Sequence, residues 1–123
     1  MAVSTPASTA NEGRRARQRR ELLAAIEAEA RRLLEEGGAG NVSMRAIARG
    51  VGLGPASLYT YFDSLDDIFT LLLLSSYKSL ATATATAVEA FSEDPPADRA
   101  FAGSLAHRRW ALAHRNEFNL LFT

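Results

Sequence analysis

Apolar side chains recur every three or four residues along much of the chain, which is the spacing of one face of an α-helix. In residues 17–36 the pattern is carried by positions such as Leu22, Ile26 and Leu33, with Glu and Arg between them. The glycine-rich segment 37–40 then interrupts it. We therefore predict an amphipathic helix over residues 17–36.

Two short helices joined by a tight turn are predicted after this glycine segment. Ser43 is a suitable N-cap, and Gly52 suits the end of the first helix because glycine adopts a positive φ at little cost. Pro55 fits the opening of the second, since its missing N–H would have no partner in a first helical turn. We expect the second helix to continue to about Phe62. This arrangement is a helix-turn-helix.

The apolar residues of this segment predict which of its side chains face solvent. The expected core positions, packed against the first helix, are Ile47, Val51, Leu53, Leu58 and Phe62. Burying them exposes small, hydroxylic or aromatic side chains on the second short helix: Ala56, Ser57, Tyr59, Thr60 and Tyr61. Such side chains allow close approach to a major groove and contact phosphates, base edges and thymine methyl groups.

Two longer helices are predicted in the second half of the chain. Acidic residues at 66 and 67 favour a helix start because they interact well with the helix dipole, and this helix is expected to continue to about residue 91. Pro95 and Pro96 break it, and a last helix is expected over residues 97–117.

The segment 68–91 is apolar enough to raise the alternative of a membrane span. Lys78 lies in its middle, four Thr and three Ser dilute it, and no basic cluster flanks it, so we expect no membrane contact. Within it, residues 81–88 alternate Ala and Thr as a strand could. Both residue types are small, so we favour a helix with a small-residue packing surface.

Basic and acidic residues balance at 14 each, but they are unevenly distributed. Residues 1–62 hold nine arginines against six acidic residues, whereas residues 63–123 hold five basic against eight acidic. The densest cluster is RRARQRR at residues 14–20. Basic runs bind phosphate backbones without reading sequence, so this run indicates DNA contact. The alternative is a solvated basic helix start.

Several function classes lack the residues they need. Without cysteine there is no disulfide and no thiol nucleophile, and no HExxH sequence is present. The glycine-rich residues 50–54 follow no predicted strand, so a phosphate loop is not indicated. We expect neither an enzyme nor a bound cofactor or metal. Residues 1–13 lack the apolar centre of a signal peptide and are interpreted as a disordered tail of a cytoplasmic protein.

The block at residues 43–62, SMRAIARGVGLGPASLYTYF, resembles the helix-turn-helix of TetR-like transcriptional regulators. The similarity lies in IA at 47–48, GL at 52–53 and SLYTYF at 57–62, and the family-like stretch covers about residues 22–74. The resemblance implies an all-α fold. A three-helix DNA-binding domain (residues 14–64) would be followed by long helices of a regulatory domain (residues 65–123).

The resemblance assigns DNA contacts position by position. Ser43 and Arg45 fall where the family's second helix contacts phosphate and a base edge, and Arg is the usual bidentate partner of guanine. Together with the basic run, the expected DNA-binding residues are Arg14, Arg15, Arg17, Ser43, Arg45, Pro55, Ala56, Ser57, Tyr59, Thr60 and Tyr61.

Three positions depart from the family pattern. Gly54 replaces the frequent Ser N-cap, Pro55 replaces a frequent Lys, and Leu65 replaces the Lys that often opens the fourth helix. Two phosphate contacts of the family are therefore missing. Our hypothesis is that the basic run at 14–20 compensates for them.

Residues 110–122 match the pattern W-x-L-x-H-x-x-x-F-x-L-x-F, which resembles the start of a WHG-type regulatory domain. Effector-pocket residues are expected at Tyr77, Trp110 and His114, with ordinary packing as the alternative for each. His107 and His114, seven residues apart, are expected on one helical face, where packing is favoured over metal binding. Because the chain ends at Thr123, we expect an incomplete regulatory domain.

The resemblance implies a DNA-binding transcriptional regulator. We expect a repressor that binds a palindromic operator in double-stranded DNA, acts as a homodimer when full-length, and is released by an unknown small-molecule effector. The alternative is a helical protein-interaction module on the same scaffold that does not bind DNA.

Overall fold

The computed structural model describes residues 6–122, with side chains from residue 12 onward. The elements are α1 (Pro6–Gly37), the short 3₁₀ helix η1 (Ala39–Asn41), α2 (Met44–Val51), α3 (Pro55–Tyr59), α4 (Leu65–Ala90), α5 (Pro96–Ala113) and α6 (Arg115–Phe122). The described residues contain no strand, and the all-α fold class is confirmed.

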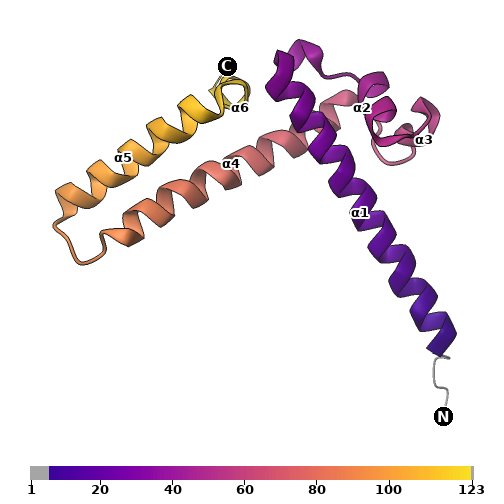
Figure 1. Ribbon diagram of the computed structural model, residues 1–123, viewed down its shortest axis with the longest axis horizontal. Helices are drawn as coiled ribbons and strands as arrows, with labels where there is room; N and C mark the ends of the chain where they lie inside the picture. Colours follow the sequence, from indigo (N-terminus) through magenta and orange to yellow (C-terminus); the bar gives the residue numbers. More distant parts are fainter. Residues whose placement is uncertain (1–5, 123) are drawn as a thin grey trace.

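The helices form two groups that meet near the C-terminal end of α1. On one side, α2 and α3 pack beside α1 (Figure 1). On the other, α4 crosses α1 and then runs antiparallel to α5, and α6 returns to contact both α1 and α4. The N-terminal half of α1 projects away from all the other helices (Figure 1). This arrangement leaves the basic run of α1 open to solvent.

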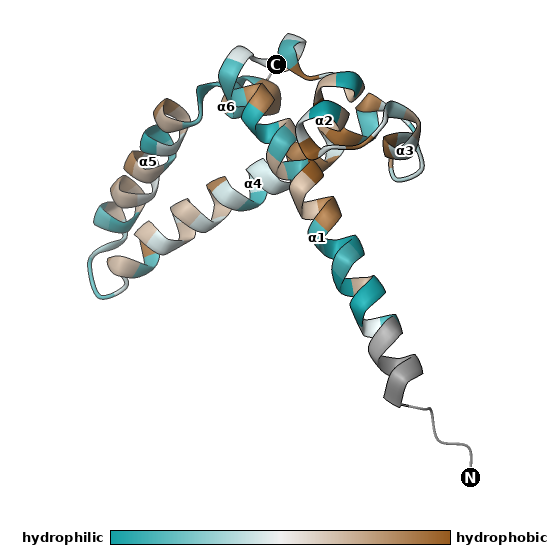
Figure 2. Cartoon of the chain, turned by 45° about the vertical axis from the view of Figure 1, so that its right-hand side comes forward, coloured by the Kyte–Doolittle hydropathy of each residue, from teal (hydrophilic) through white to brown (hydrophobic). Residues whose placement is uncertain are grey.

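The hydrophobic core lies where α1, α2, α3 and α4 meet. Its fully buried members include Ile26 of α1, Ile47 of α2, Leu58 of α3 and Leu72 of α4. Val51, Leu53 and Phe62 pack against this cluster while partly exposed. The core positions expected from the sequence are thus confirmed. Figure 2 shows apolar residues gathered where α1 and α4 cross, and polar residues along the part of α1 that projects away from the other helices.

Local capping chemistry fixes the ends of the short helices as predicted. The Ser43 hydroxyl accepts a hydrogen bond from the backbone N–H of Ala46 at 3.0 Å and caps α2. Gly52 ends α2 in the left-handed region, with φ 76° and ψ 26°. Pro55 occupies the first turn of α3. The turn between the two helices therefore depends on a conformation that suits glycine.

Replacing Gly52 with Ala is expected to lower the free energy of unfolding by about 1–2 kcal/mol, because a Cβ disfavours the left-handed conformation. Gly40→Ala is the matched control, since its φ is not positive and a Cβ there would meet nothing within 4 Å. Urea denaturation measures both. Equal costs for the two substitutions would contradict this assignment.

The structure corrects the N-terminal prediction. Residues 6–13 form the first turns of α1 instead of belonging to a disordered tail, and the helix begins at Pro6 rather than near residue 17. Extending an existing helix by a residue costs far less than nucleating one, which outweighs the polar composition of this segment. Residues 1–5 lie outside the described part of the chain. The basic run consequently sits within a helix.

Two further helix ends differ from the prediction. Helix α3 ends at Tyr59 instead of Phe62. Just after Tyr59, the Thr60 hydroxyl donates to the Ser57 carbonyl at 2.6 Å, and the chain forms a turn. The expected helix over residues 97–117 is broken at His114, which caps α5 with φ −128° and ψ 55°.

A tertiary contact explains this break. The side-chain amide of Asn116 donates to the carbonyls of Leu34 and Glu35, at 2.9 and 3.1 Å. These carbonyls belong to the last turn of α1, where carbonyls run out of N–H partners within the helix. The Leu34 carbonyl also accepts the backbone N–H of Gly38 at 2.7 Å, and the Asn116 amide adds a partner to both. Turning the chain at His114 lets α6 provide those partners, so the end of α1 is capped by a residue about 80 positions later.

Helix α4 is long and apolar enough to cross a membrane by length and composition, the only such helix among the described residues. Core helices of soluble proteins satisfy the same criterion. Ile68 and Leu72 are fully buried in the core, and Leu80 is also buried. Although only 22% of the apolar stretch is buried, α4 packs against α1, α5 and α6, and its buried face belongs to the core of the fold.

Candidate nucleic-acid interface

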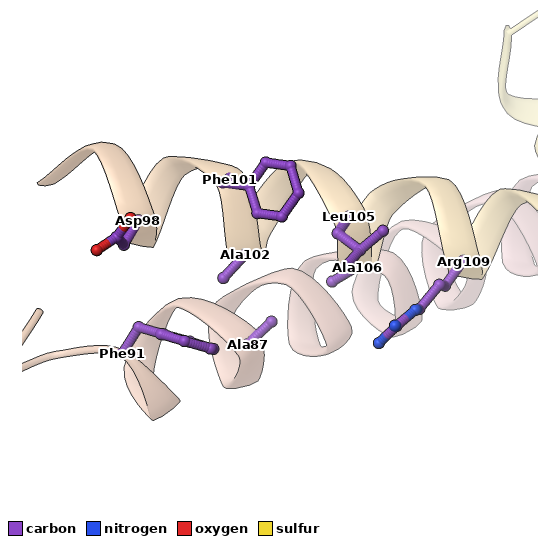
Figure 3. A pocket seen from close by; sticks show the side chains of 8 residues that line it. All are labelled: Ala87, Phe91, Asp98, Phe101, Ala102, Leu105, Ala106 and Arg109. Atoms are coloured by element: carbon purple, nitrogen blue, oxygen red, sulfur yellow. The ribbon is translucent and has the colours of Figure 1, made fainter.

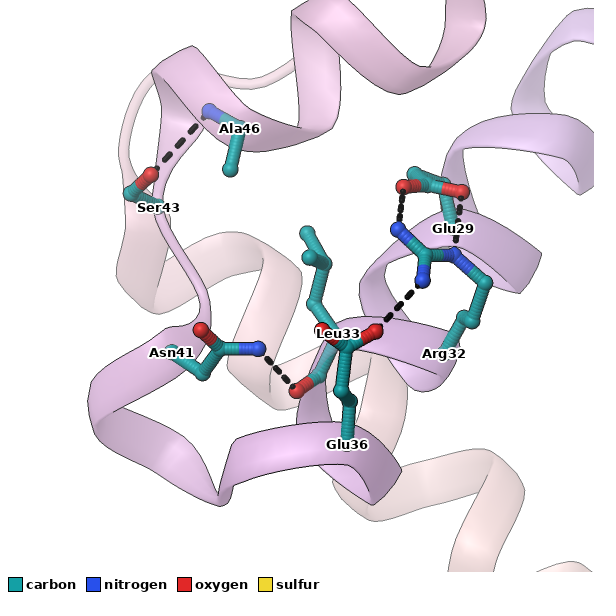
Figure 4. Close-up of polar contacts among 7 residues, drawn as sticks. All are labelled: Glu29, Arg32, Leu33, Glu36, Asn41, Ser43 and Ala46. Atoms are coloured by element: carbon teal, nitrogen blue, oxygen red, sulfur yellow. Dashed lines mark hydrogen bonds and ion pairs between the residues drawn. The ribbon is translucent and has the colours of Figure 1, made fainter.

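The solvent-facing side of α2 carries Ser43 at its cap and Arg45 in its first turn, both exposed. The Ser43 hydroxyl accepts the Ala46 N–H (Figure 4), which leaves its own hydrogen free to donate to an anionic oxygen. Among the described residues no ion pair involves Arg45. This end of α2 therefore presents a hydroxyl donor and an uncompensated guanidinium, which suit a phosphate and a guanine edge respectively.

Helix α3 presents the small and aromatic face that the sequence predicted. Pro55, Ala56 and Ser57 are exposed at its start, and the Tyr59 side chain is 51% exposed. Leu58 between them is fully buried and anchors the helix. Thr60 is exposed, but its hydroxyl hydrogen is used by the Ser57 carbonyl, so only its lone pairs remain for a partner. The structure brings these residues together on one surface.

Tyr61 lies apart from this surface, half-buried at the junction with α1. The guanidinium carbon of Arg19 lies 5.2 Å from the centre of its ring, a cation–π contact worth about 0.5–1 kcal/mol at an exposed site. The contact ties the basic run to the turn after α3. Sequence reasoning missed the Arg19–Tyr61 pair, because nothing in the sequence indicates that residues 42 positions apart should touch.

The arginines of α1 fall into two electrostatic groups. Arg31 pairs with Glu27 at 3.2 Å. Arg32 pairs with Glu29 and Glu36 at 2.7 and 2.6 Å, as Figure 4 shows. The pKa of Glu29 is lowered by a hydrogen bond from Arg32 and by the positive charge of that guanidinium. These two arginines are neutralised within the helix.

Arg14, Arg15 and Arg17 belong to the other group. All three are exposed, and no ion pair found in the described part of the chain involves them. They lie on the projecting part of α1, which Figure 1 shows clear of the other helices. Their charge is available to an external anion, as binding to a phosphate backbone requires.

Of the three residues expected to line an effector pocket, two lie together and the third lies apart from them. Trp110 and His114 line a cavity of about 70 Å³ between α1, α4 and α6, with their rings stacked 4.5 Å apart. Tyr77 is half-exposed and points to Phe122 instead, at 6.4 Å between ring centres. His114 is the C-cap of α5 and its N–H still bonds the Trp110 carbonyl. It lines the 70 Å³ cavity, whereas His107 lines a different one beside Thr84 and Val88, so the two histidines do not share a pocket.

A larger cavity, of about 390 Å³, lies between α4 and α5 and contains none of the expected pocket residues (Figure 3). Its walls are mostly apolar, formed by side chains such as Phe91, Phe101 and Leu105. Asp98 and Arg109 add charged groups at its edges. Sequence reasoning missed this cavity because no motif marks the residues that line it.

Comparison with known proteins identifies relatives of this chain. Residues 26–72, from the middle of α1 to the first turns of α4, match the family described as bacterial regulatory proteins, tetR family. Three mycobacterial proteins are similar over 114 residues at 34% identity: HTH-type transcriptional regulators Mb1846 of Mycobacterium bovis and MT1864 and Rv1816 of Mycobacterium tuberculosis. The match covers 93% of this chain and 49% of each relative, so the chain spans about half the length of these relatives.

Proposed function

We propose that this chain, whose residues 26–72 match the tetR family of bacterial regulatory proteins, is a TetR-like regulator and binds duplex DNA sequence-specifically through the exposed face of α2 and α3. The observation that carries the proposal is the separation of roles within the two helices. Ile47 and Leu58 are fully buried, whereas Arg45 and Tyr59 project into solvent. The core thus fixes the orientation of side chains suited to base edges.

In this proposal α3 enters the major groove and α2 lies across its edge. Arg45 contacts a guanine, and the Tyr59 ring and the Ala56 methyl provide apolar contact to thymine. Ser43 and Ser57 bind phosphates or base edges through their hydroxyls, whereas Thr60, whose hydroxyl hydrogen is bonded to the Ser57 carbonyl, accepts from an amino group on a base edge. Pro55 starts the helix close to the backbone, and Tyr61 faces phosphate while Arg19 supports its ring.

The α1 arginines supply a phosphate contact that replaces the missing family lysines. The triple substitution Arg14→Ala, Arg15→Ala, Arg17→Ala is expected to flatten the plot of log binding constant against log salt concentration. The slope should fall by about 1 for each arginine that contacts a phosphate. Fluorescence anisotropy on a labelled duplex, measured over a salt series, gives the slope directly.

A control with the same change in net charge distinguishes contact from general attraction. Arg99→Ala, Arg108→Ala and Arg109→Ala remove three arginines from α5, on the other arm of the molecule. The slope measured for this control should differ from that of the wild type by no more than about 1, the change expected for one phosphate contact. If both triple variants reduce the slope equally, the basic run makes no specific contact.

We also propose how DNA binding is regulated. A repressor bound to a palindromic operator as a homodimer would be released when a small-molecule effector moves the helices after α4. The bonds from Asn116 to Leu34 and Glu35 support this proposal, because they join α6 directly to α1. A regulator of this kind acts in the cytoplasm and needs no catalytic site.

Salt-dependent binding to duplex DNA tests the proposed function against the alternative of a protein-interaction module. Gly54, Pro55 and Leu65, which depart from the family pattern, are the residues that favour that alternative. We expect anisotropy on a duplex of random sequence to show binding that weakens steeply as salt rises. The absence of duplex binding at low salt would favour the interaction module.

A further inference from the structure

The small polar cavity between α1, α4 and α6 has a composition that packing alone does not explain. Its volume is about 70 Å³, and its walls include Glu35 of α1, Ser76 and Ser79 of α4, Trp110 and His114 at the end of α5, and Glu117 of α6. A water molecule occupies about 30 Å³ in the liquid. The cavity therefore has room for an occupant about the size of two water molecules.

Two buried oxygen atoms at this cavity lack a hydrogen-bond partner. They are the Ser76 hydroxyl oxygen and Oε1 of Glu117, and both residues are only 2% exposed. Burying a polar oxygen without a partner costs about 1–3 kcal/mol, and more when it is charged. An occupant that donates hydrogen bonds would remove this cost for both oxygens.

The other polar groups around the cavity already have partners. The indole N–H of Trp110 donates to the Ser79 hydroxyl at 2.9 Å, and Nδ1 of His114 lies 2.9 Å from the Trp110 carbonyl. Arg31 faces the cavity from α1, but its guanidinium is bound to Glu27 and to the Ser75 hydroxyl. The Ser76 hydroxyl, which can accept or donate, and the acceptor Oε1 of Glu117 are therefore the buried oxygen atoms left open to an occupant.

The charged groups that face the cavity include two carboxyl groups, of Glu35 on α1 and Glu117 on α6, while α4 contributes only serines. The guanidinium of Arg31 also faces it but is already paired with Glu27, so the carboxyl groups favour a positive occupant. Burial raises the pKa of Glu117, and so do a hydrogen bond to Glu35 and the negative charge of Glu35. The charge of His114 lowers it. A proton on Glu117 is thus one way to reduce the repulsion, and a bound cation is another.

We propose that this cavity is a binding site for a small cation with N–H donors, namely an ammonium ion or the end of a primary alkylammonium ligand. Its N–H groups would donate to Oε1 of Glu117 and to the Ser76 hydroxyl, and its charge would compensate the Glu117 carboxylate beside Glu35. Binding requires Glu117 to lose its proton, so affinity should increase as the pH is raised through the pKa of Glu117. The proposal does not depend on DNA binding.

Trp110 is the only tryptophan in the chain and lines this cavity, so its fluorescence reports on occupancy. The full chain is titrated with ammonium chloride and methylammonium chloride, with sodium chloride and tetramethylammonium chloride as controls for ionic strength and for charge without N–H donors. We expect a saturable change with the first two salts only, at lower concentration as the pH is raised.

Two variants test the residues involved. Glu117→Gln keeps the shape of the side chain but removes its charge, and should weaken binding about tenfold or more. Ser76→Ala removes one acceptor with little change in volume and gives a second readout, should the first variant fail to fold. Glu93→Gln, in the exposed turn before α5, is the control and should bind as the wild type does.

The proposal is overturned if no ammonium salt changes the fluorescence, which would leave water as the occupant of the cavity. It is also overturned if sodium or tetramethylammonium produces the same saturable change, because the cation would then need no N–H donor. An unchanged midpoint in both Glu117→Gln and Ser76→Ala would place any binding elsewhere.

Discussion

Replacing Leu58 with Ala is expected to lower the free energy of unfolding by about 2–5 kcal/mol. Leu58 is fully buried in the cluster that includes Ile47 and Ala48. Helix α3 has five residues, and Leu58 is the one that is buried. Truncating it removes apolar contacts and leaves a cavity that so short a helix cannot fill without moving. Denaturant unfolding followed by circular dichroism measures the loss.

The same substitution on the surface provides the control. Leu112 on α5 is 53% exposed, and Leu112→Ala should change the stability by no more than about 0.5 kcal/mol. The Leu58 variant should also lose DNA affinity, because it no longer holds Tyr59 in place. A similar stability loss in both variants would show that α3 does not depend on its anchor.

Replacing Arg45 with Ala is expected to reduce discrimination between the preferred DNA sequence and random duplex by about 1–3 kcal/mol, which corresponds to roughly 5- to 150-fold. Arg45 is exposed at the start of α2 and makes no ion pair among the described residues. Its removal should leave stability almost unchanged and weaken random-duplex binding only slightly. Anisotropy on the two duplexes gives the ratio.

Arg108→Ala on α5 serves as the matched control, since this arginine is also exposed but lies on the other arm. It should preserve both affinities. If Arg45→Ala weakens specific and random duplex by the same factor, Arg45 contacts a phosphate and does not read a base. That result would move the reading function to α3 alone.

The helix-turn-helix could be predicted because its geometry is set by local rules. A serine that caps α2, a glycine with positive φ that ends it, and a proline that opens α3 each act within a few residues of their own position. The buried positions follow from helical periodicity. The exposed residues of the proposed DNA surface are then what remains on the other side of each helix.

The features that escaped prediction depend on contacts between distant parts of the chain. The break at His114 arises because Asn116 caps the end of α1, and periodicity within residues 97–117 contains no information about that partner. The same holds for Arg19 against Tyr61 and for Glu117 beside Glu35. Each pair depends on how α6 or the turn after α3 packs against α1, which local patterns do not encode.

The unpaired arginines and the α2–α3 face are expected to contribute differently to DNA binding, the former to affinity and the latter to sequence preference. Arg31 and Arg32 are held by glutamates of the same helix, whereas Arg14, Arg15 and Arg17 are free of ion pairs among the described residues. Phosphate contacts by the latter would raise affinity for any sequence. Sequence preference would then depend on the α2–α3 face.

Selection of bound sequences from a pool of randomised duplexes tests most directly whether α2 and α3 read DNA. The wild-type chain and the double variant Arg45→Ala, Tyr59→Ala are each incubated with the pool, and a second set carries an appended coiled coil that enforces dimers. We expect the wild type to enrich a defined sequence, palindromic in the enforced dimer, and the double variant to bind without enrichment. Failure of the wild type to enrich any sequence, even as an enforced dimer, would contradict sequence-specific DNA recognition by this chain.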